Sequence, residues 1–448
     1  MADIENKIQI QTTKKKVLIL SLYYPPCNIT AAQRVYSWAK YLNEHNIYPI
    51  VVTRRWDYPI KEQLDAYRET PPDIIHEQYL DYEVYYLPYK ANLRDKILVK
   101  YGDKRFKLIR RLLTLIEIIS LNFTNFFLPY KNLYNFTYKY LKNNIDIKIL
   151  ITTAYPFSMF RFAYMLKKKL QHIEWIGDYR DLWTTRPDDL FIPKNTFWGK
   201  IRAWLEPISE KKWLSNAYAF TSISQKYVDI IGKFINKKGY PILNGYIEED
   251  FQIKIPEPDK NVFLITFLGT LKAMQKVEVF LDAFEKALYY FKDKITIKIR
   301  FIGTAYEETA AQRLYNYTKK YSQYVEITKR IHREEAIKKQ IESQLLLLVS
   351  YSGGTGGGTG SKMYEYIGTG KPMFLCPSDK AMMEEIIKTT GQGFFCNTTD
   401  EAYELLVKLI EEFYQTGHIS MPNYNDEVRK YYSRRTQTKL LADLINHI

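Results

Sequence analysis

The chain has 448 residues, which is too long for one ordinary hydrophobic core and predicts two domains of about 200 residues each. Its hydrophobic content of 46% and aromatic content of 15% can fill two cores, which excludes an intrinsically disordered protein. The formal net charge of +15 predicts an anionic partner and leaves nucleic acid, a lipid surface and a phosphorylated substrate open.

The sequence predicts a protein of the cytoplasm. Its three cysteines, Cys27, Cys376 and Cys396, lie far apart without metal-ligand spacing, so neither a disulfide framework nor a zinc site is predicted. Residues 1–16 mix acidic and polar side chains and lack the apolar centre of a signal peptide. The most apolar stretch, residues 112–128, is interrupted by one glutamate and two asparagines, so we do not expect it to span a bilayer.

Short aliphatic strand candidates alternate with helical stretches along the chain. The first series lies at residues 17–22, 49–53, 147–152, 175–178 and 217–222. The second series lies at residues 263–269, 297–303, 345–349 and 373–376. This alternation is typical of α/β folds. Because turn-forming residues gather between residues 239 and 258, we predict two α/β domains that meet near residue 245.

A segment within residues 90–142 has basic and apolar side chains at helical spacing. The cations, on one side of the predicted helix, are Lys100, Lys104, Lys107 and Arg111, and the apolar residues, on the adjoining side, are Leu108, Leu112, Ile116, Ile119 and Phe123. Two interpretations remain open. The segment is either an amphipathic helix in a membrane interface, with its cations over anionic headgroups, or a core-facing helix with a solvated basic face.

A glycine-rich loop, within SYSGGTGGGTGSKMYEY at residues 350–366, follows a buried strand candidate and precedes a helix that ends at Gly370. Missing side chains let a ligand approach the backbone, and the free amides of a helix start favour phosphate. The order Gly360, Ser361, Lys362 differs from a Walker loop, and no G-x-G-x-x-G register fits. We therefore predict an anion site of another type, with a flexible surface loop as the alternative.

Seven stretches, in their order and spacing, resemble a known family. They are KVLILSLYYPP at residues 16–26, AQRV at 32–35, AKYL at 39–42, GDYRDLW at 177–183, LNGYIEEDF at 243–251, FLGTL at 267–271 and SKMYEYIGTGKP at 361–372. Together they resemble the retaining nucleotide-sugar glycosyltransferases that build bacterial surface polysaccharides, a group similar to glycosyltransferase family 4.

This resemblance implies the GT-B fold, an α/β fold in which two Rossmann-like domains face each other across a cleft. Residues 1–245 are expected to form the acceptor-binding domain and residues 246–424 the nucleotide-sugar-binding domain. Residues 425–448 are expected to form a helix that packs back on the first domain.

The resemblance also implies where the donor binds. The loop at residues 353–360 would hold the diphosphate or the sugar, Lys362 and the helix start would carry the phosphate charge, and Glu365 would accept hydrogen bonds from two ribose hydroxyls. The implied donor residues are Gly269, Thr270, Lys272, Gly358, Thr359, Gly360, Ser361, Lys362 and Glu365. The alternatives are that Lys362 only caps the loop and that Glu365 is a solvated helix position.

The chain departs from the family's pattern at several donor positions. Gly357 stands where many relatives have the first of two glutamates eight residues apart, and Thr270 stands where many have an arginine. A lysine is usual near Gln275, so Lys272 or Lys276 would supply the cation, with Lys276 as a candidate catalytic residue. The identity of the donor sugar therefore stays open.

On the acceptor side the resemblance implies Thr30, Arg34, Asp178 and Arg180 as ligands, and Asp181 is the candidate catalytic residue beside the acceptor hydroxyl. The alternative for Arg34 is a surface ion pair. The alternative for Asp181 is a strand-end carboxylate that pairs with Arg180 or caps a helix. No histidine base is expected, because residues 152–156 read TTAYP where relatives often have a histidine.

These observations predict a glycosyltransferase that moves a sugar, with retention of configuration, from a nucleotide diphosphate sugar to an acceptor hydroxyl. UDP is favoured over GDP, and the expected acceptor is a lipid-linked saccharide at the inner face of the cell membrane. Fixed amides and lysines would stabilise the departing diphosphate, so no metal or other cofactor is expected.

Two other functions are compatible with the sequence. The first is a non-catalytic nucleotide-sugar-binding or scaffold subunit of the same fold, which the missing glutamate at Gly357 permits. The second is a nucleic-acid-binding protein, which the charge suggests. Because no RNA-binding or DNA-reading motif is visible, no nucleic-acid partner is expected.

Overall fold

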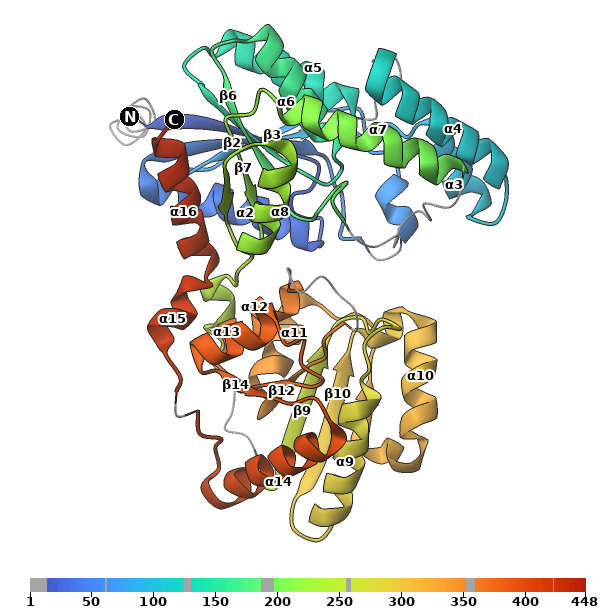
Figure 1. Ribbon diagram of the computed structural model, residues 1–448, viewed down its shortest axis with the longest axis vertical. Helices are drawn as coiled ribbons and strands as arrows, with labels where there is room; N and C mark the ends of the chain where they lie inside the picture. The colour runs from blue at the N-terminus through green and yellow to red at the C-terminus, as the bar shows by residue number, and fades with distance from the viewer. Residues whose placement is uncertain are drawn as a thin grey trace. The chain divides into compact units, whose positions relative to one another are not determined.

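The computed structural model describes residues 14–60, 63–124, 130–186, 197–254, 259–351, 359–421 and 423–448. The chain forms two compact units, one of Met1–Leu243 with Thr438–Ile448 and the other of Asn244–Gln437. Each unit has one β-sheet with helices packed against it (Figure 1). The prediction of an α/β fold with two Rossmann-like domains is confirmed.

The first unit is built on an eight-stranded sheet. Its strands are β1 (Lys15–Ser21), β2 (Ile47–Arg54), β3 (Ile75–Gln78), β4 (Glu83–Leu87), β5 (Ile149–Thr153), β6 (Glu174–Tyr179), β7 (Ala219–Ser222) and β8 (Gly239–Pro241). They lie in the order β3-β4-β2-β1-β5-β6-β7-β8, and all neighbours are parallel except β3 and β4. Strand β2 is buried along its whole length, as expected for a strand inside a parallel sheet that is covered on both faces.

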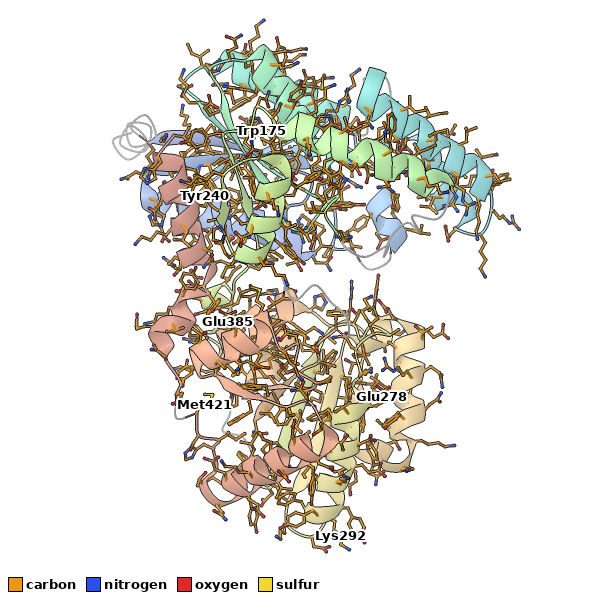
Figure 2. All side chains as sticks on the ribbon, in the orientation of Figure 1. Trp175, Tyr240, Glu278, Lys292, Glu385 and Met421 are labelled. Carbon is orange, nitrogen blue, oxygen red and sulfur yellow. The ribbon has the colours of Figure 1, made fainter. Side chains whose placement is uncertain are left out.

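Helices cover both faces of this sheet. The helices of this unit are α2 (Thr30–Tyr41), α3 (Leu93–Tyr101), α4 (Lys107–Ile119), α5 (Lys131–Asn143), α6 (Ser158–Lys169), α7 (Phe197–Leu214), α8 (Gln225–Ile235) and α16 (Arg434–Asn446), of which α3 and α4 contribute no residue to the core clusters of the described residues. One face packs against α5, α6, α7 and α8 around the fully buried Trp175 (Figure 2). The other face packs against α2 and the second half of α16.

The sequence patterns missed three strands of this unit, β3, β4 and β8. Strand β3 is an antiparallel edge strand with mostly exposed side chains, and β4 reads EVYYL. Strand β8 has only three residues, and all of them are half-buried. Strands β3 and β8 lie at the two edges of the sheet, where a continuous aliphatic run is not required. Strand β4 is internal and mostly buried, but its glutamate and two tyrosines interrupt the aliphatic run that marks a central parallel strand.

The second unit has a parallel six-stranded sheet. Its strands are β9 (Val262–Leu268), β10 (Thr296–Ile302), β11 (Val325–Ile327), β12 (Leu345–Leu348), β13 (Met373–Leu375) and β14 (Gly393–Phe395), in the order β11-β10-β9-β12-β13-β14. Its helices are α9 (Glu278–Phe291), α10 (Glu308–Thr318), α11 (Arg333–Ile341), α12 (Ser361–Thr369), α13 (Met382–Thr390), α14 (Thr399–Thr416) and α15 (Asp426–Tyr431). The aliphatic pattern of the sequence did not predict β11 and β14, which have three residues each.

The predicted single helix at residues 425–448 is in fact two helices, α15 and α16. The break has a physical cause, because the backbone N–H of Arg434 donates to the carbonyl of Tyr246 at 2.7 Å instead of to a helical carbonyl. Helix α16 then continues into the core of the first unit, where its buried residues are Leu441, Ala442, Leu444 and Ile445. The two units divide between Leu243 and Asn244 and again between Gln437 and Thr438.

The predicted basic amphipathic helix is also interrupted. Helix α3 ends at Gly102, where φ is +75°, and α4 begins at Lys107, so Lys100 and Lys104 do not lie on the same helix as Arg111. The alternative of a core-facing helix is wrong, because α4 has no buried residue. Its apolar side chains Leu108, Leu112, Ile116 and Ile119 are 78%, 54%, 38% and 42% exposed.

Candidate functional site

Two glycines lie at the carboxyl ends of neighbouring strands in the second unit. Gly269 follows β9 and Gly303 follows β10, with φ of +96° and +82°, a backbone region that L side chains rarely adopt. The two glycines abut, because a Cβ added to Gly303 would lie 3.7 Å from the Cα of Gly269. In open parallel sheets ligands bind outside the carboxyl ends of the strands, so a ligand is expected at this bare backbone.

Lys362, in the first turn of α12, reaches the same place. Its Nζ would lie 3.7 Å from a Cβ added at Gly269, and it lies 3.9 Å from the ring centroid of Phe267. The side chain as a whole is half-buried, but the Nζ itself is buried and has no hydrogen-bond partner among the described residues. An ammonium carries three donors, so a ligand anion at Gly269 would satisfy a group that is costly to bury alone.

The pKa of Lys362 reflects this environment. Burial lowers its pKa to about 7, an effect that the charge of Lys272 adds to and that of Glu365 opposes. A bound phosphate would favour the charged form and raise the pKa again. The protonation state of Lys362 is therefore coupled to the binding of an anion near neutral pH.

The loop after Gly269 is fixed by a buried glutamine. The Oε1 of Gln275 accepts from the backbone N–H of Lys272 at 2.9 Å, and its Nε2 donates to the carbonyl of Val349 at 2.6 Å. Thr270 is half-buried in this loop, and Lys276 is exposed. Lys272 forms an ion pair with Glu307. It is one of the two lysines predicted to replace the cation that relatives carry, and its charge lowers the pKa of Lys362.

Glu365 is not a solvated helix position. Its side chain is 20% exposed, and its Oε1 accepts from Nη1 of Arg333 at 2.7 Å. The same guanidinium donates from Nη2 to Oδ2 of Asp250 at 2.8 Å. Arg333 thereby orients Glu365, which places one carboxylate in the turn after Lys362. Sequence reasoning missed Arg333 because it comes from α11, and no local pattern connects it to α12.

The other predicted donor residues surround the start of α12. Thr359 is buried, and its Oγ1 has no hydrogen-bond partner among the described residues. Gly360 is exposed at the N-cap of α12, and Ser361 opens the helix. Gly358 lies outside the described residues, as do Gly357 and the preceding glycines. The described part of the site thus consists of two strand-end glycines and one helix start.

In the first unit Arg34 and Asp178 are paired and buried. Their side chains are 1% and 0% exposed, and Nη2 of Arg34 donates to Oδ1 of Asp178 at 2.7 Å. Arg34 also donates to the carbonyls of Ile242 and Leu243, and Thr221 donates to Asp178. The alternative of a surface ion pair for Arg34 is wrong. Because both side chains are committed to each other, this arrangement argues against their contact with an acceptor.

The other predicted residues of the first unit lie nearer the solvent. Arg180 follows β6, and its Nε is buried without a hydrogen-bond partner among the described residues. Burial lowers the pKa of Arg180, and the charges of Asp181 and Asp178 oppose this. Asp181 is exposed, and Thr30 opens α2. Arg180 is therefore a half-buried predicted acceptor ligand whose Nε lacks a hydrogen-bond partner in the part of the chain that the structure describes.

Comparison with protein families gives one match. Residues 248–434 match the family described as "Glycosyl transferases group 1". The matched range includes Gly269, Gly303, Lys362 and Glu365, so the candidate site lies within the part of the chain that is similar to this family. A comparison with curated proteins gives no significant match.

Solved structures of similar fold cover nearly the whole chain. Sucrose-phosphate synthase from Thermosynechococcus elongatus is 11% identical, with a TM-score of 0.60 over 97% of this chain and 99% of that one. The α,α-trehalose-phosphate synthase (UDP-forming) from Burkholderia xenovorans, in complex with glucose-6-phosphate, is 11% identical, with a TM-score of 0.57 over 96% and 99%. HepE from Anabaena, in complex with UDP and glucose, is 11% identical, with a TM-score of 0.55 over 97% and 100%. These neighbours confirm the predicted GT-B fold.

Proposed function

We propose that the protein is a glycosyltransferase that transfers a sugar from a UDP-sugar to an acceptor hydroxyl with retention of configuration. The observation that carries the proposal is the buried ammonium of Lys362, which has no hydrogen-bond partner among the described residues and faces the bare backbone of Gly269. The glycosyltransferase group 1 match over residues 248–434 supports the reaction class. HepE, which has a similar fold, was solved in complex with UDP, and this supports UDP as the nucleotide of the donor.

The proposed chemistry is electrostatic. The departing diphosphate gathers negative charge, and the ammonium of Lys362, the start of α12 and Lys272 would stabilise it without reorganisation. The acceptor hydroxyl would pass its proton to the leaving phosphate on the same face, so that the reaction requires no separate general base. Asp181 and Lys276 remain the proposed catalytic side chains beside the acceptor and the donor. We propose that no metal is required.

A ligand screen followed by a turnover assay tests this function. UDP is expected to raise the thermal midpoint of the protein more than GDP, ADP or inorganic phosphate does, because a ligand stabilises the state that binds it. UDP release from UDP-sugars should then continue in the presence of EDTA. UDP binding without any turnover would favour the non-catalytic alternative, and loss of activity in EDTA that magnesium restores would overturn the metal-free mechanism.

Glu365 is proposed to bind the ribose hydroxyls. Glu365→Gln should weaken the binding of both UDP and GDP by about 1–3 kcal/mol, because both nucleotides carry the same ribose and a charged acceptor is lost. Titration calorimetry measures the change. Glu342→Gln is a matched control, since Glu342 likewise pairs with an arginine, Arg300, in the same unit. Equal affinity in a folded Glu365→Gln variant would remove Glu365 from the site.

We further propose that the enzyme works on a lipid-linked acceptor at an anionic membrane surface. The apolar side chains Leu108, Leu112, Ile116 and Ile119 of α4 are exposed rather than packed in a core. The basic side chains of Lys100, Lys104, Lys107 and Arg111 are exposed as well. Helix α7 adds an exposed Trp204, and its Ser209 contacts Asn122 just beyond α4. Among the described residues, no helix has the length and hydropathy to cross a bilayer, so attachment would be peripheral.

Replacing Lys100, Lys104, Lys107 and Arg111 with glutamine should weaken attachment to anionic vesicles by a few kcal/mol. Each basic residue near such a surface contributes about 1 kcal/mol, and the contribution is screened by salt. Co-sedimentation with anionic and neutral liposomes at low and high salt measures the effect. UDP binding should not change.

The matched control changes the same number of exposed basic residues elsewhere in the first unit. Lys139, Lys142, Lys148 and Lys233 are exposed and lie outside α3 and α4. Their replacement with glutamine alters the net charge equally but should alter vesicle binding little. Equal loss in both variants would show that only total charge matters, and equal binding of the unmodified protein to anionic and neutral vesicles would contradict the proposal.

A further inference from the structure

A large cavity lies in the first unit beneath α4, separate from the nucleotide site proposed in the second unit. Its volume is about 790 Å³, within the range of about 300–1,000 Å³ that is usual for small-molecule sites. It is open to the surface and lined by the segment at residues 69–72, the segment at residues 88–96, one side of α4 and residues 130–132. None of the family motifs in the sequence accounts for it.

The cavity lies at the edge of the sheet where ligands bind in this class of fold. Pro88, Tyr89 and Lys90 directly follow β4, so they stand at the carboxyl end of a parallel strand. Tyr89 is fixed there by two hydrogen bonds with Thr70, at 2.8 and 3.1 Å. The guanidinium of Arg54, at the end of β2, lies 3.7 Å from the Tyr89 ring centroid. This wall is therefore rigid.

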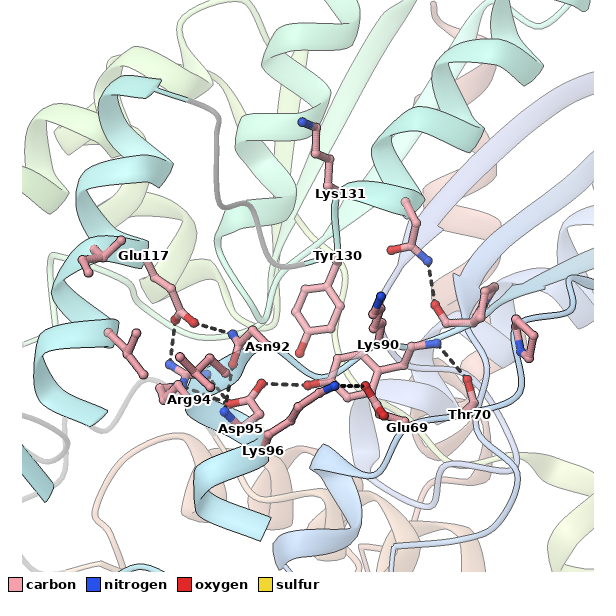
Figure 3. A pocket seen from close by; sticks show the side chains of 17 residues that line it. Glu69, Thr70, Lys90, Asn92, Arg94, Asp95, Lys96, Glu117, Tyr130 and Lys131 are labelled. Carbon is pink, nitrogen blue, oxygen red and sulfur yellow. Dashed lines mark hydrogen bonds and ion pairs between the residues drawn. The ribbon is translucent and has the colours of Figure 1, made fainter. Parts of the chain in front are cut away.

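One wall of the cavity carries a closed polar network (Figure 3). Arg94 pairs with Asp95 and with Glu117, each at 2.8 Å, and Asn92 donates to Glu117. Tyr89 donates to Asp95 at 2.7 Å. Burial raises the pKa of Glu117 to about 7, an effect that Arg94 opposes. The polar groups of this wall form hydrogen bonds and ion pairs with one another. They therefore shape the cavity and do not need a ligand to satisfy them.

The lining has a surplus of positive charge. Its acids are Glu69, Asp95 and Glu117, and its cations are Lys90, Arg94, Lys96 and Lys131. Every acid is already paired, Glu69 with Lys96 at 3.2 Å and the other two with Arg94. Lys90 and Lys131 are exposed and have no ion-pair partner in the part of the chain that the structure describes. Lys90 and Lys131 are thus the two cations of the lining with which an anionic group could pair.

The α4 side of the cavity also carries apolar side chains beside Glu117. Leu113 and Ile116 line the cavity, while Leu108 and Leu112 of the same helix are exposed outside it. Leu93, which is 61% exposed, adds a further apolar side chain from α3. The apolar contacts of Leu113 and Ile116 inside the cavity therefore come from the same helix as the exposed leucines, next to the Arg94–Glu117 pair.

We propose that this cavity binds a single-chain amphiphile with a phosphate head, the chain against Leu113 and Ile116 and the phosphate at Lys90 and Lys131. This inference rests on the proposed lipid-linked acceptor. It adds to that proposal the place where the lipid part of the acceptor binds. The occupant is a monomeric amphiphile and not a bilayer phospholipid, because the cavity is bounded by α3, α4 and two loops, whereas the bilayer would contact the exposed face of α4.

Decyl phosphate, decanol and inorganic phosphate are the probes, titrated into the whole 448-residue chain below the critical micelle concentration. Decyl phosphate should bind at one site at least tenfold more tightly than either decanol or inorganic phosphate. Leu113→Trp, which fills the cavity, should lower this affinity at least tenfold. The neighbouring Leu112→Trp, which points outside, should change it less than twofold. The double variant Lys90→Gln with Lys131→Gln should lower the affinity for decyl phosphate to nearly that for decanol.

Vesicle binding and UDP binding separate this inference from the others. In Leu113→Trp, binding to anionic vesicles and to UDP should persist, whereas a parallel loss of vesicle binding would assign the ligand to the bilayer and overturn the proposal. If Leu113→Trp does not fold, a photoreactive alkyl phosphate gives the answer in the unmodified protein. Crosslinks should map to residues 88–96, 113–117 and 130–132, and crosslinks elsewhere, or decyl phosphate binding no tighter than inorganic phosphate, would contradict the proposal.

Discussion

Lys362→Met is expected to lower the affinity for UDP-glucose by about 30- to 150-fold while making the fold more stable. The binding loss corresponds to about 2–3 kcal/mol, the scale of hydrogen bonds to a charged group. In the unmodified protein the ammonium of Lys362 is buried beside Phe267 without a hydrogen-bond partner among the described residues, which costs stability. Methionine has a similar length but no charge, so the variant avoids this cost. Titration calorimetry and thermal unfolding of the same variant measure both effects.

The two effects have opposite signs, which distinguishes a binding role from a structural one. If Lys362 only capped the loop, Lys362→Met would lower the thermal midpoint and leave nucleotide affinity nearly unchanged. Lys371→Met is the control, since burial lowers the pKa of Lys371 as well but it lies beyond the end of α12. Its affinity for UDP-glucose should match that of the unmodified protein.

The affinity for UDP-glucose should also depend on pH through Lys362. The free protein loses the Lys362 proton as the pH rises through about 7, whereas a bound diphosphate holds the proton to higher pH. Affinity should therefore be flat below pH 7 and fall by up to about tenfold per pH unit above it, with proton uptake on binding. UDP-glucose is a diphosphate diester and does not itself titrate there. In Lys362→Met the slope should vanish.

Asp178→Ala is expected to destabilise the first unit by about 3–5 kcal/mol. The change leaves the buried guanidinium of Arg34 without its carboxylate and removes the acceptor of Thr221. Urea unfolding followed by tryptophan fluorescence reports on this unit, since Trp38 and Trp175 are buried in it. A loss below about 1 kcal/mol would show that the pair contributes little.

Two further variants define the origin of this loss. Asp181→Ala removes an exposed carboxylate three residues away and should change stability by less than about 0.5 kcal/mol. The double change Arg34→Met with Asp178→Leu removes both charges and should recover most of the stability, because an apolar pair avoids the desolvation cost of the ions. UDP binding in the second unit should stay unchanged in all three variants.

The sequence by itself determined the central strands and the helix that carries the donor site. Aliphatic runs such as residues 345–348 are typical of buried strands in a parallel sheet, and β12 lies there. Gly370, with φ of +68°, ends α12 where the glycine predicted it. These features depend on local periodicity and on the conformational freedom of one residue, so they can be read along the chain.

The edge strands and the break between α15 and α16 required the tertiary structure. Strands β3, β8, β11 and β14 are short or half-exposed, so pairing with a neighbour rather than local pattern decides that they form. Helix α16 starts anew at Arg434 because the backbone of Tyr246, far away in the sequence, takes its N–H. No local signal could reveal such a partner.

The site shows the same division. The sequence predicted that Gly269, Lys362 and Glu365 belong together, and the structure places Gly269 beside Lys362 and Glu365 in the following turn, although their role in binding stays a prediction. It could not show that Lys362 is buried without a partner, that Arg333 holds Glu365, or that Arg34 is buried against Asp178. Burial and ion pairing depend on which distant segments the fold brings together, and so only the tertiary structure decides them.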